Sequence, residues 1–275
     1  MQTYEEIIIP NESRKKIKGL VPRGLRFKTK PSAKMQRCLV VLDLEKALSD
    51  MTTIFAERTL SRLVTQTQAT LLSRRSISPT VVADVMVGLR RLIHNDPYVT
   101  TSEQAVRRLL LAKAHNAADR LIASVELQGE TLFVWSCEPK LYTCSIKDIP
   151  VLAKLSKVQL ANFEVSKSGS RINWPKADVD LDLGSIRYWA DPTFRHNKDK
   201  ELREAAKSYG VAIRELRLEK GLKQSDILGL SSRHVRRLEA GEGQPFTSTL
   251  EKLAAAHEMS LESYLDTLAT RSASK

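Results

Sequence analysis

The stretch that begins at Ser231 constrains the fold more than any other part of this sequence. Ser231 is a favourable N-cap residue, which predicts that a helix starts there. At about 100° per residue, Val235 and Leu238 lie on one side of this helix, whereas Arg233 and Arg237 lie on the opposite side. The pattern therefore predicts a helix that packs its apolar side into a core and turns its arginine side outward.

An arginine-bearing helix face has two interpretations. It suits the major groove of DNA, because arginine donates two hydrogen bonds to O6 and N7 of guanine, a pairing worth about 1–3 kcal/mol of discrimination between bases. It is also typical of a solvated surface that only keeps a protein soluble. The sequence on both sides of the helix favours the first interpretation.

These flanking residues follow a recognisable order. A helix ends at Gly221-Leu222, Gln224 opens a second helix, and Gly229-Leu230-Ser231 forms a turn before the arginine-bearing helix. That helix ends in Glu239-Ala240-Gly241, and further helices are indicated by Thr249-Leu250-Glu251-Lys252-Leu253-Ala254 and Ser260-Leu261-Glu262-Ser263-Tyr264-Leu265. The order resembles the Cro/repressor, or Xre-type, helix-turn-helix family.

The chain departs from this family in two places. Lys223 stands where threonine usually precedes Gln224, and a few residues are missing between Gln224 and Gly229, so the second helix is expected to be short. The resemblance implies that Ser232, Arg233 and Arg237 reach bases and that Gln224 binds a backbone phosphate. His234 on the flank is a further candidate for a phosphate contact. The residues expected to bind DNA are Gln224, Ser232, Arg233, His234, Arg236 and Arg237.

The expected function is that of a sequence-specific transcription regulator with double-stranded DNA as its partner. A single helix-turn-helix unit binds weakly, so a homodimer on an inverted repeat is expected, with half-sites about 34–36 Å apart or a multiple of that distance. Two alternatives remain open. The protein is an antitoxin that binds a partner toxin and represses its own operon, or a protein-interaction adaptor whose helix-turn-helix no longer reads DNA.

Residues 119–192 predict a small α+β domain. Strands are expected at Leu121–Leu127, Thr131–Cys137 and Leu141–Lys147, followed by a short helix at Lys147–Lys157. If the last two strands form a hairpin centred between Pro139 and Lys140, alternation places six residues on one apolar face: Phe133, Trp135, Cys137, Tyr142, Cys144 and Ile146. In this register Trp135 lies opposite Cys144, and Cys137 and Cys144 are diagonal neighbours that form no disulfide.

The same residues resemble a second family. Ile149-Pro150-Val151-Leu152, Phe163-Glu164-Val165, Ile172-Asn173-Trp174-Pro175 and Asp178-Val179-Asp180-Leu181 follow one another in an order that resembles the domain of unknown function 2442 family. The resemblance implies a small α+β domain that is often found beside helix-turn-helix modules. It implies no established chemistry.

The N-terminal part is strongly basic. The chain carries 44 Lys and Arg residues against 32 Asp and Glu residues, a net charge of +12. Ten of the basic and three of the acidic residues lie in residues 1–40, which give +7 and are broken by several Pro and Gly residues. We expect an extended arm or a poorly ordered segment there, whose basic residues add non-specific affinity for polyanions.

The remaining segments complete the predicted organisation. Residues 41–118 predict a helical domain, with a helix near Leu44–Leu60, a second after Ser78-Pro79 and a third capped by Thr101 or Ser102. Residues 193–210 predict a linker or the start of a helix, and residues 211–270 the helix-turn-helix domain. The fold class is therefore α+β: a helical N-terminal region, a small middle domain with a three-stranded sheet and a helix, and an all-α C-terminal domain.

Catalysis, metal binding and cofactor binding are not expected. Asp178, Asp180 and Asp182 alternate as in a calcium loop, but Gly184 stands one place too late and Ala190 stands where the loop needs glutamate. The three cysteines have no zinc spacing, and no nucleophile or phosphate-loop motif is present. The start of the chain lacks a signal peptide pattern and no apolar run is long enough for a membrane helix, so a cytoplasmic location is expected.

Overall fold

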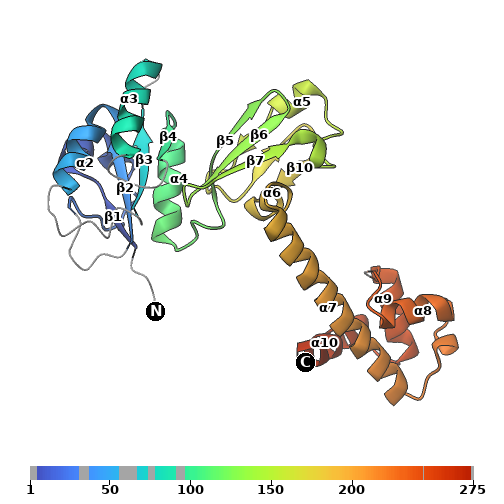
Figure 1. Cartoon of the computed structure of the whole chain (residues 1–275). Helices are drawn as coiled ribbons and strands as arrows, with labels where there is room; N and C mark the ends of the chain where they lie inside the picture. Colours follow the sequence, from blue (N-terminus) through green and yellow to red (C-terminus); the bar gives the residue numbers. More distant parts are fainter. Residues whose placement is uncertain are drawn as a thin grey trace. The chain divides into compact units, whose positions relative to one another are not determined.

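The computed structural model of this chain describes residues 5–30, 37–55, 67–73, 78–90, 97–243 and 245–273. They belong to two compact units, Met1–Asp191 and Pro192–Lys275. The first unit combines sheets with helices, and the described residues of the second unit form helices and turns (Figure 1).

A parallel four-stranded sheet opens the first unit, with its strands in the order β1-β2-β3-β4. The strands are β1 (Glu5–Ile8), β2 (Arg37–Asp43), β3 (Thr67–Leu72) and β4 (Tyr98–Thr100). The prediction of a helical domain over residues 41–118 was therefore wrong. Residues 1–40 were predicted as an extended arm or a poorly ordered segment, but their described part contains β1, two short helices and the start of β2.

Helices cover both faces of this sheet. On one face, buried side chains of β2 such as Val40 and Leu42 pack against η2 (Leu44–Lys46), α2 (Ala47–Phe55) and α3 (Pro79–Arg90). On the other face, Leu39 and Val41 pack against α1 (Asn11–Ile17), η1 (Lys18–Leu20) and α4 (Glu103–Ala114). A strand that is buried on both faces has a continuous run of apolar residues in its sequence. The periodicity of such a run does not distinguish it from a buried helix.

The helices predicted in this region are present. The described part of α2 overlaps the helix expected near Leu44–Leu60, although residues 56–66 lie outside the described residues. Pro79 is the first residue of α3. Ser102 is the N-cap of α4, where its hydroxyl accepts a hydrogen bond from the backbone N–H of Ala105 at 3.2 Å. The local sequence signals therefore predicted where these helices start, but they did not predict that the distant strands of this region pair in a sheet.

The middle of the chain contains two antiparallel three-stranded sheets, in the orders β5-β6-β7 and β10-β9-β8. The first corresponds to the predicted three-stranded sheet. The first holds β5 (Ile122–Gln128), β6 (Thr131–Ser136) and β7 (Leu141–Ser145), and the second β8 (Glu164–Val165), β9 (Ile172–Trp174) and β10 (Val179–Leu181). Instead of one helix at 147–157, the structure has η5 (Ile146–Asp148) and α5 (Lys157–Ala161), and α6 (Leu183–Ala190) follows β10.

The register of the β6–β7 hairpin differs from the predicted one. Cys144 pairs with Leu132, and Trp135 pairs with Leu141. A shift by an odd number of residues exchanges the two faces of a strand, so Leu132 and Val134, rather than Phe133 and Trp135, join Tyr142 and Cys144 in the core of this domain. The ring of Trp135 instead lies 4.8 Å from that of Tyr98, the first residue of β4. None of the three cysteines forms a disulfide, and all three are buried.

One arginine joins the middle sheets to α4. The guanidinium group of Arg108 donates to the backbone carbonyls of Ala123, Val165 and Ser166 at 2.9–3.0 Å. Partial burial lowers the pKa of this guanidinium from its ordinary value. These bonds satisfy carbonyls of β5 and of the segment around β8, so α4 is part of the same compact unit.

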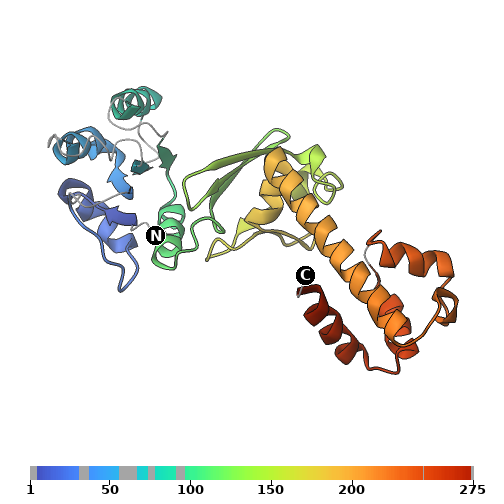
Figure 2. The same ribbon diagram turned by 60° about the horizontal axis from the view of Figure 1, so that its bottom comes forward.

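The second unit consists of α7 (Pro192–Glu219), η6 (Gln224–Asp226), α8 (Ser232–Glu239), α9 (Thr247–Ala256) and α10 (Leu261–Ala273). The segment predicted as a linker or helix at 193–210 is the first part of the long α7. The later part of α7 packs against α8 and α10 (Figure 2). Their shared core contains Ile213, Leu216, Ile227, Val235, Leu238, Leu253, Tyr264 and Leu268. None of the helices that the structure describes is long and apolar enough to cross a membrane.

Candidate nucleic-acid interface

The helix expected to face DNA has the predicted polarity. α8 starts after Ser231, whose hydroxyl accepts a hydrogen bond from the backbone N–H of His234 at 3.2 Å. Val235 is fully buried and Leu238 is 5% exposed. The candidate DNA-binding residues of α8 are all exposed: Ser232, Arg233, His234, Arg236 and Arg237. The fold therefore presents these five side chains together on one short helix.

The three arginines of α8 differ in their surroundings. Nε of Arg237 lies 3.3 Å from a carboxylate oxygen of Glu242, and both side chains are exposed. Such a surface pair contributes about 0–1 kcal/mol and is easily exchanged for another anion. Arg233 and Arg236 form no ion pair with any residue that the structure describes. Two guanidinium groups on this face are thus available to an external acceptor, and the third is held by a weak pair.

A single 3-10 turn stands where the second helix of the motif was expected. η6 covers only Gln224–Asp226, and the side chain of Asp226 accepts a hydrogen bond at 2.8 Å from the backbone N–H of Lys223, the residue before the turn. This hydrogen bond lowers the pKa of the Asp226 carboxyl. Ile227 closes the turn and is 1% exposed. The missing residues noted in the sequence have therefore removed helical turns without removing the apolar anchor.

A buried polar network connects the turn, α7 and α8. Nε and Nη2 of Arg217 donate to the two carboxylate oxygens of Glu239 at 2.5 and 3.0 Å, and Nη1 donates to the carbonyl of Leu222 at 2.6 Å. The hydrogen bonds to Glu239 raise the pKa of the Arg217 guanidinium. Arg217 is 6% exposed and Glu239 8% exposed. Sequence reasoning missed this pair, because Glu239 attracted attention only as the end of the α8 pattern.

Gln224 belongs to the same network. Its side-chain amide donates to a carboxylate oxygen of Glu239 at 2.8 Å. A side-chain amide has two N–H donors and one carbonyl acceptor, so this bond leaves one donor of the half-buried side chain for a phosphate. The predicted phosphate contact remains a prediction, and Gln224 has in addition an internal partner that the sequence did not reveal.

Close backbone contact sets how α8 meets α7. A Cβ atom placed on Gly210 of α7 would lie 2.6–2.8 Å from backbone atoms of Leu238, Glu239 and Gly241. Gly241 itself has φ = +71°, a conformation that favours glycine and that ends α8. Two glycines therefore allow the end of α8 to lie directly on the backbone of α7.

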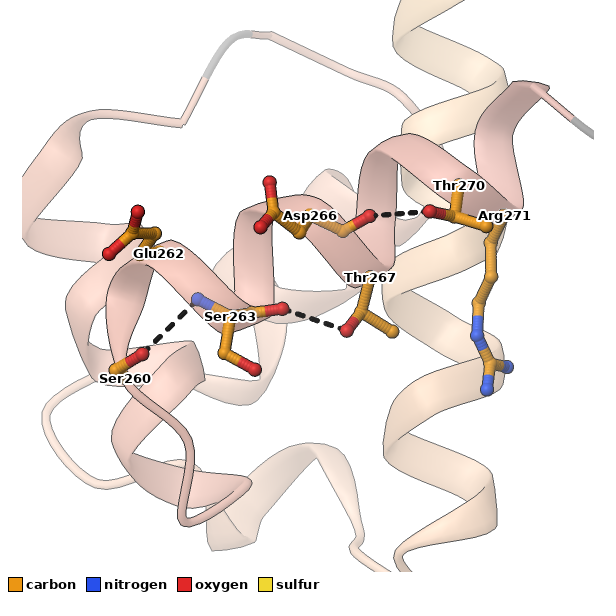
Figure 3. Close-up of a pocket in the computed structure, with 7 residues that line it drawn as sticks. All are labelled: Ser260, Glu262, Ser263, Asp266, Thr267, Thr270 and Arg271. Atoms are coloured by element: carbon orange, nitrogen blue, oxygen red, sulfur yellow. Dashed lines mark hydrogen bonds between the residues drawn. The ribbon is translucent and has the colours of Figure 1, made fainter.

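The outer side of α10 holds a polar depression that lacks the features of an anion site (Figure 3). Both threonine hydroxyls have partners within the helix, because Thr267 donates to the carbonyl of Ser263 at 2.7 Å and Thr270 to that of Asp266 at 2.9 Å. Arg271 is held by two hydrogen bonds to Glu219 at 2.6 and 2.8 Å. With Glu262 and Asp266 beside them, this surface is unfavourable for a phosphate.

Two of the three alternating aspartates of the middle domain have structural partners. Asp180 accepts from the side-chain amide of Asn173 at 2.5 Å, and Asp182 caps α6 by accepting from the backbone N–H of Ser185 at 2.7 Å. Over the described parts of the chain, no group of three or more His, Cys, Asp or Glu side chains is arranged to hold a metal ion.

Comparisons with known proteins agree with both resemblances. Residues 213–263 match the family described as helix-turn-helix, and residues 119–192 match the family described as protein of unknown function (DUF2442). A search of curated proteins gives no match. Residues 213–263 are thus an Xre-type helix-turn-helix domain, which implies DNA binding, and residues 119–192 are a DUF2442 domain.

Proposed function

We propose that this protein is a sequence-specific transcription regulator that inserts α8 into the major groove of DNA and has no catalytic role. The observation that carries the proposal is the exposed arginine face of α8, formed by Arg233, Arg236 and Arg237, on a helix whose other side is buried. Guanidinium groups arranged in this way match the acceptor pairs on the major-groove edge of guanine.

In this proposal α8 and the turn before it make different contacts with DNA. Arg233 and Arg237 read bases at separate positions. Gln224 binds a backbone phosphate at the turn before α8, where it positions the domain without reading sequence. A homodimer on an inverted repeat supplies the affinity that one short helix lacks.

Selection of bound sequences from random duplex DNA tests the proposal. The full-length protein is used at about 150 mM salt, because binding at low salt is dominated by phosphate contacts and says little about specificity. An enriched inverted repeat supports a dimeric sequence reader. If the folded protein enriches no sequence, the proposal fails, and the antitoxin and adaptor interpretations become the ones to pursue with a search for a bound protein.

Single substitutions then separate base reading from phosphate binding. Arg233→Ala and Arg237→Ala are each expected to relax base choice at one position and to cost about 1–3 kcal/mol on the selected site. Gln224→Ala is expected to weaken all sequences alike. Arg203→Ala on α7 is a matched control, since this exposed arginine is hydrogen-bonded to the carbonyl of Asp199 in its own helix. Equal losses on every sequence for all three test variants would defeat the assignment.

A further inference from the structure

The N-terminal charge is gathered around an open pocket rather than spread along an arm. The pocket has a volume of about 1480 Å³ and lies within the first unit, between the segment 21–30, α1 and the end of α4. Its lining includes the basic residues Arg14, Arg23, Arg26, Lys28, Lys30 and Lys113, together with His115. None of the described residues that line it is acidic.

Most of these cations face solvent. All of them except the half-buried Lys113 are exposed. Arg23, Arg26 and Lys30 form no ion pair with any residue described in the structure. Like charges held near one another repel, and they raise the local positive potential far above that of a mixed surface. The pocket therefore attracts a partner that carries many negative charges.

The segment that carries these cations is fixed to the fold. The backbone N–H of Ile9 donates to the carbonyl of Lys28, and that of Lys28 to the carbonyl of Ile7, both at 2.9 Å. Leu25 and Phe27 turn inward and pack against the core that includes α4. Arg26 and Lys28 flank Phe27 and point the other way, as exposed residues of the same extended stretch.

Two further contacts hold the walls of the pocket together. The guanidinium group of Arg14 lies 5.6 Å from the centre of the Phe27 ring, and Nη2 of Arg107 on α4 donates to the carbonyl of Gly19 at 3.2 Å. A binding surface that is already ordered loses less conformational entropy on binding than a disordered arm does. The backbone that carries these cations is therefore already ordered before a partner binds.

The dimensions and chemistry of the pocket favour a polymer over a small molecule. Sites for small ligands usually have volumes of about 300–1,000 Å³ and mostly apolar walls that enclose the ligand. This pocket is larger, and most of its cations stand exposed around a partly apolar surface that includes Ile7, Leu25, Phe27 and Leu111. Repeated contacts between Lys or Arg and phosphate are the usual source of sequence-independent affinity for DNA.

We propose that this basic pocket binds the phosphodiester backbone of duplex DNA and gives the protein a second, sequence-independent contact. The contact is separate from the base-reading role of α8 and persists if α8 reads no bases. Each cation that neutralises a phosphate releases condensed counterions, so binding through the pocket weakens steeply as salt is added.

The test compares two triple variants of the full-length protein. The pocket variant carries Arg23→Ala, Arg26→Ala and Lys30→Ala. The control variant carries Lys154→Ala, Lys157→Ala and Lys176→Ala, which remove the same charge from exposed residues of the middle domain that have no ion pair to the described residues. Affinity for a labelled duplex of random sequence is measured by fluorescence anisotropy from about 50 to 200 mM salt. Circular dichroism and thermal melting confirm that both variants are folded.

The expected result is a change in salt dependence. If all three residues contact phosphates, the slope of log K against log salt becomes shallower by about 2.7 in the pocket variant. Over a fourfold increase in salt, this corresponds to a loss of affinity about 40-fold smaller than in the unchanged protein. The control variant keeps the original slope. A variant with Arg23→Lys and Arg26→Lys also keeps it, because counterion release depends on charge.

Several results would overturn the proposal. One is a pocket variant that binds the random duplex with the slope of the control variant. Another is an effect confined to vesicles of anionic phospholipid, or to free ATP, with duplex binding unchanged. The same measurements on an Arg233→Ala/Arg237→Ala protein keep the two sites apart. A pocket effect that persists in this protein supports the pocket proposal, whereas loss of the selected operator with an unchanged salt slope concerns only α8.

Discussion

Removing the carboxylate of Glu239 should destabilise the second unit strongly and selectively. Glu239→Ala deletes the acceptors of three hydrogen bonds, two from Arg217 and one from Gln224. The guanidinium group of Arg217 then stays buried with the carbonyl of Leu222 as its remaining partner among those bonds. Breaking a buried ion pair by removing one partner costs about 3–5 kcal/mol, because an uncompensated charge is left in the interior.

The arrangement of the tryptophans provides an internal control for this measurement. All three, Trp135, Trp174 and Trp189, lie in the first unit, so tryptophan fluorescence reports on that unit. Far-UV circular dichroism at 222 nm is dominated by helix and includes the second unit. In urea, Glu239→Ala should move the ellipticity transition down by about 2–3 M, for an m-value near 1.5 kcal/mol/M, and should leave the fluorescence transition in place.

Two further variants make the test decisive. Glu242→Ala removes the exposed partner of Arg237 and should cost about 0–1 kcal/mol. Arg217→Met combined with Glu239→Leu replaces the whole pair by apolar residues and should recover much of the lost stability. A loss below about 1 kcal/mol for Glu239→Ala would refute the reasoning, as would an equal shift of both transitions.

The remaining predictions concern close packing and thiol chemistry. Gly210→Ala should destabilise the second unit by about 1–3 kcal/mol despite the better helix propensity of alanine, whereas Gly184→Ala in α6, where the nearest atom is 3.5 Å away, should be neutral or stabilising in the same urea titration. Burial raises the pKa of Cys137 to about 12 and that of Cys144 to about 11. A thiol-specific reagent at pH 8 should therefore leave both unmodified in the folded protein and modify both in urea, because the thiolate is the reactive form. Since the folded state holds these protons to higher pH than the unfolded state does, the free energy of unfolding should fall as the pH rises above about 9, and Cys137→Ser should reduce that fall if the hydroxyl fits the site.

The sequence predicted the second unit well because its signals are local. The N-cap at Ser231, the glycine turn before it and the spacing of Val235 and Leu238 all lie within one helix and its ends. The polarity of α8 follows from these residues alone, and the structure has it as predicted. The contact residues for DNA remain predictions, since exposure shows only that they are available.

The N-terminal sheet was missed because its signals are not local. β2 pairs with β1 and β3 through residues that are distant in sequence, and alternate residues of the strand face different helical layers. The residues from Leu39 to Leu42 are all apolar, so the run lacks the alternation of apolar and polar residues that would indicate a strand. The basic segment 21–30 was read as an arm for a related reason. Its Pro and Gly residues mark turns, but nothing in them shows that Lys28 bridges to Ile8 or that Phe27 packs inward.

The hairpin error shows how little separates two registers. Both the predicted and the observed pairing place Tyr142 and Cys144 on an apolar face, and both match a short turn. The difference lies in which residues of β6 face them. Leu132 and Val134 pack in the core of the DUF2442 domain, whereas the ring of Trp135 packs against that of Tyr98 in β4. The sequence did not reveal β4 as a strand. A register that depends on a neighbouring sheet is not specified by the hairpin itself.

The buried network around Glu239 explains how a shortened turn still presents α8. A full second helix would orient the recognition helix through its own packing, but η6 covers only Gln224–Asp226. In its place, Arg217 is hydrogen-bonded both to Glu239 at the end of α8 and to the carbonyl of Leu222 before the turn. Gln224 ties the turn itself to the same carboxylate. One carboxylate therefore links α7, η6 and α8, and the residues lost from the turn are compensated by polar contacts. On this reasoning Glu239 governs DNA binding without contacting DNA, so Glu239→Ala should weaken the selected operator even under conditions in which the second unit remains folded.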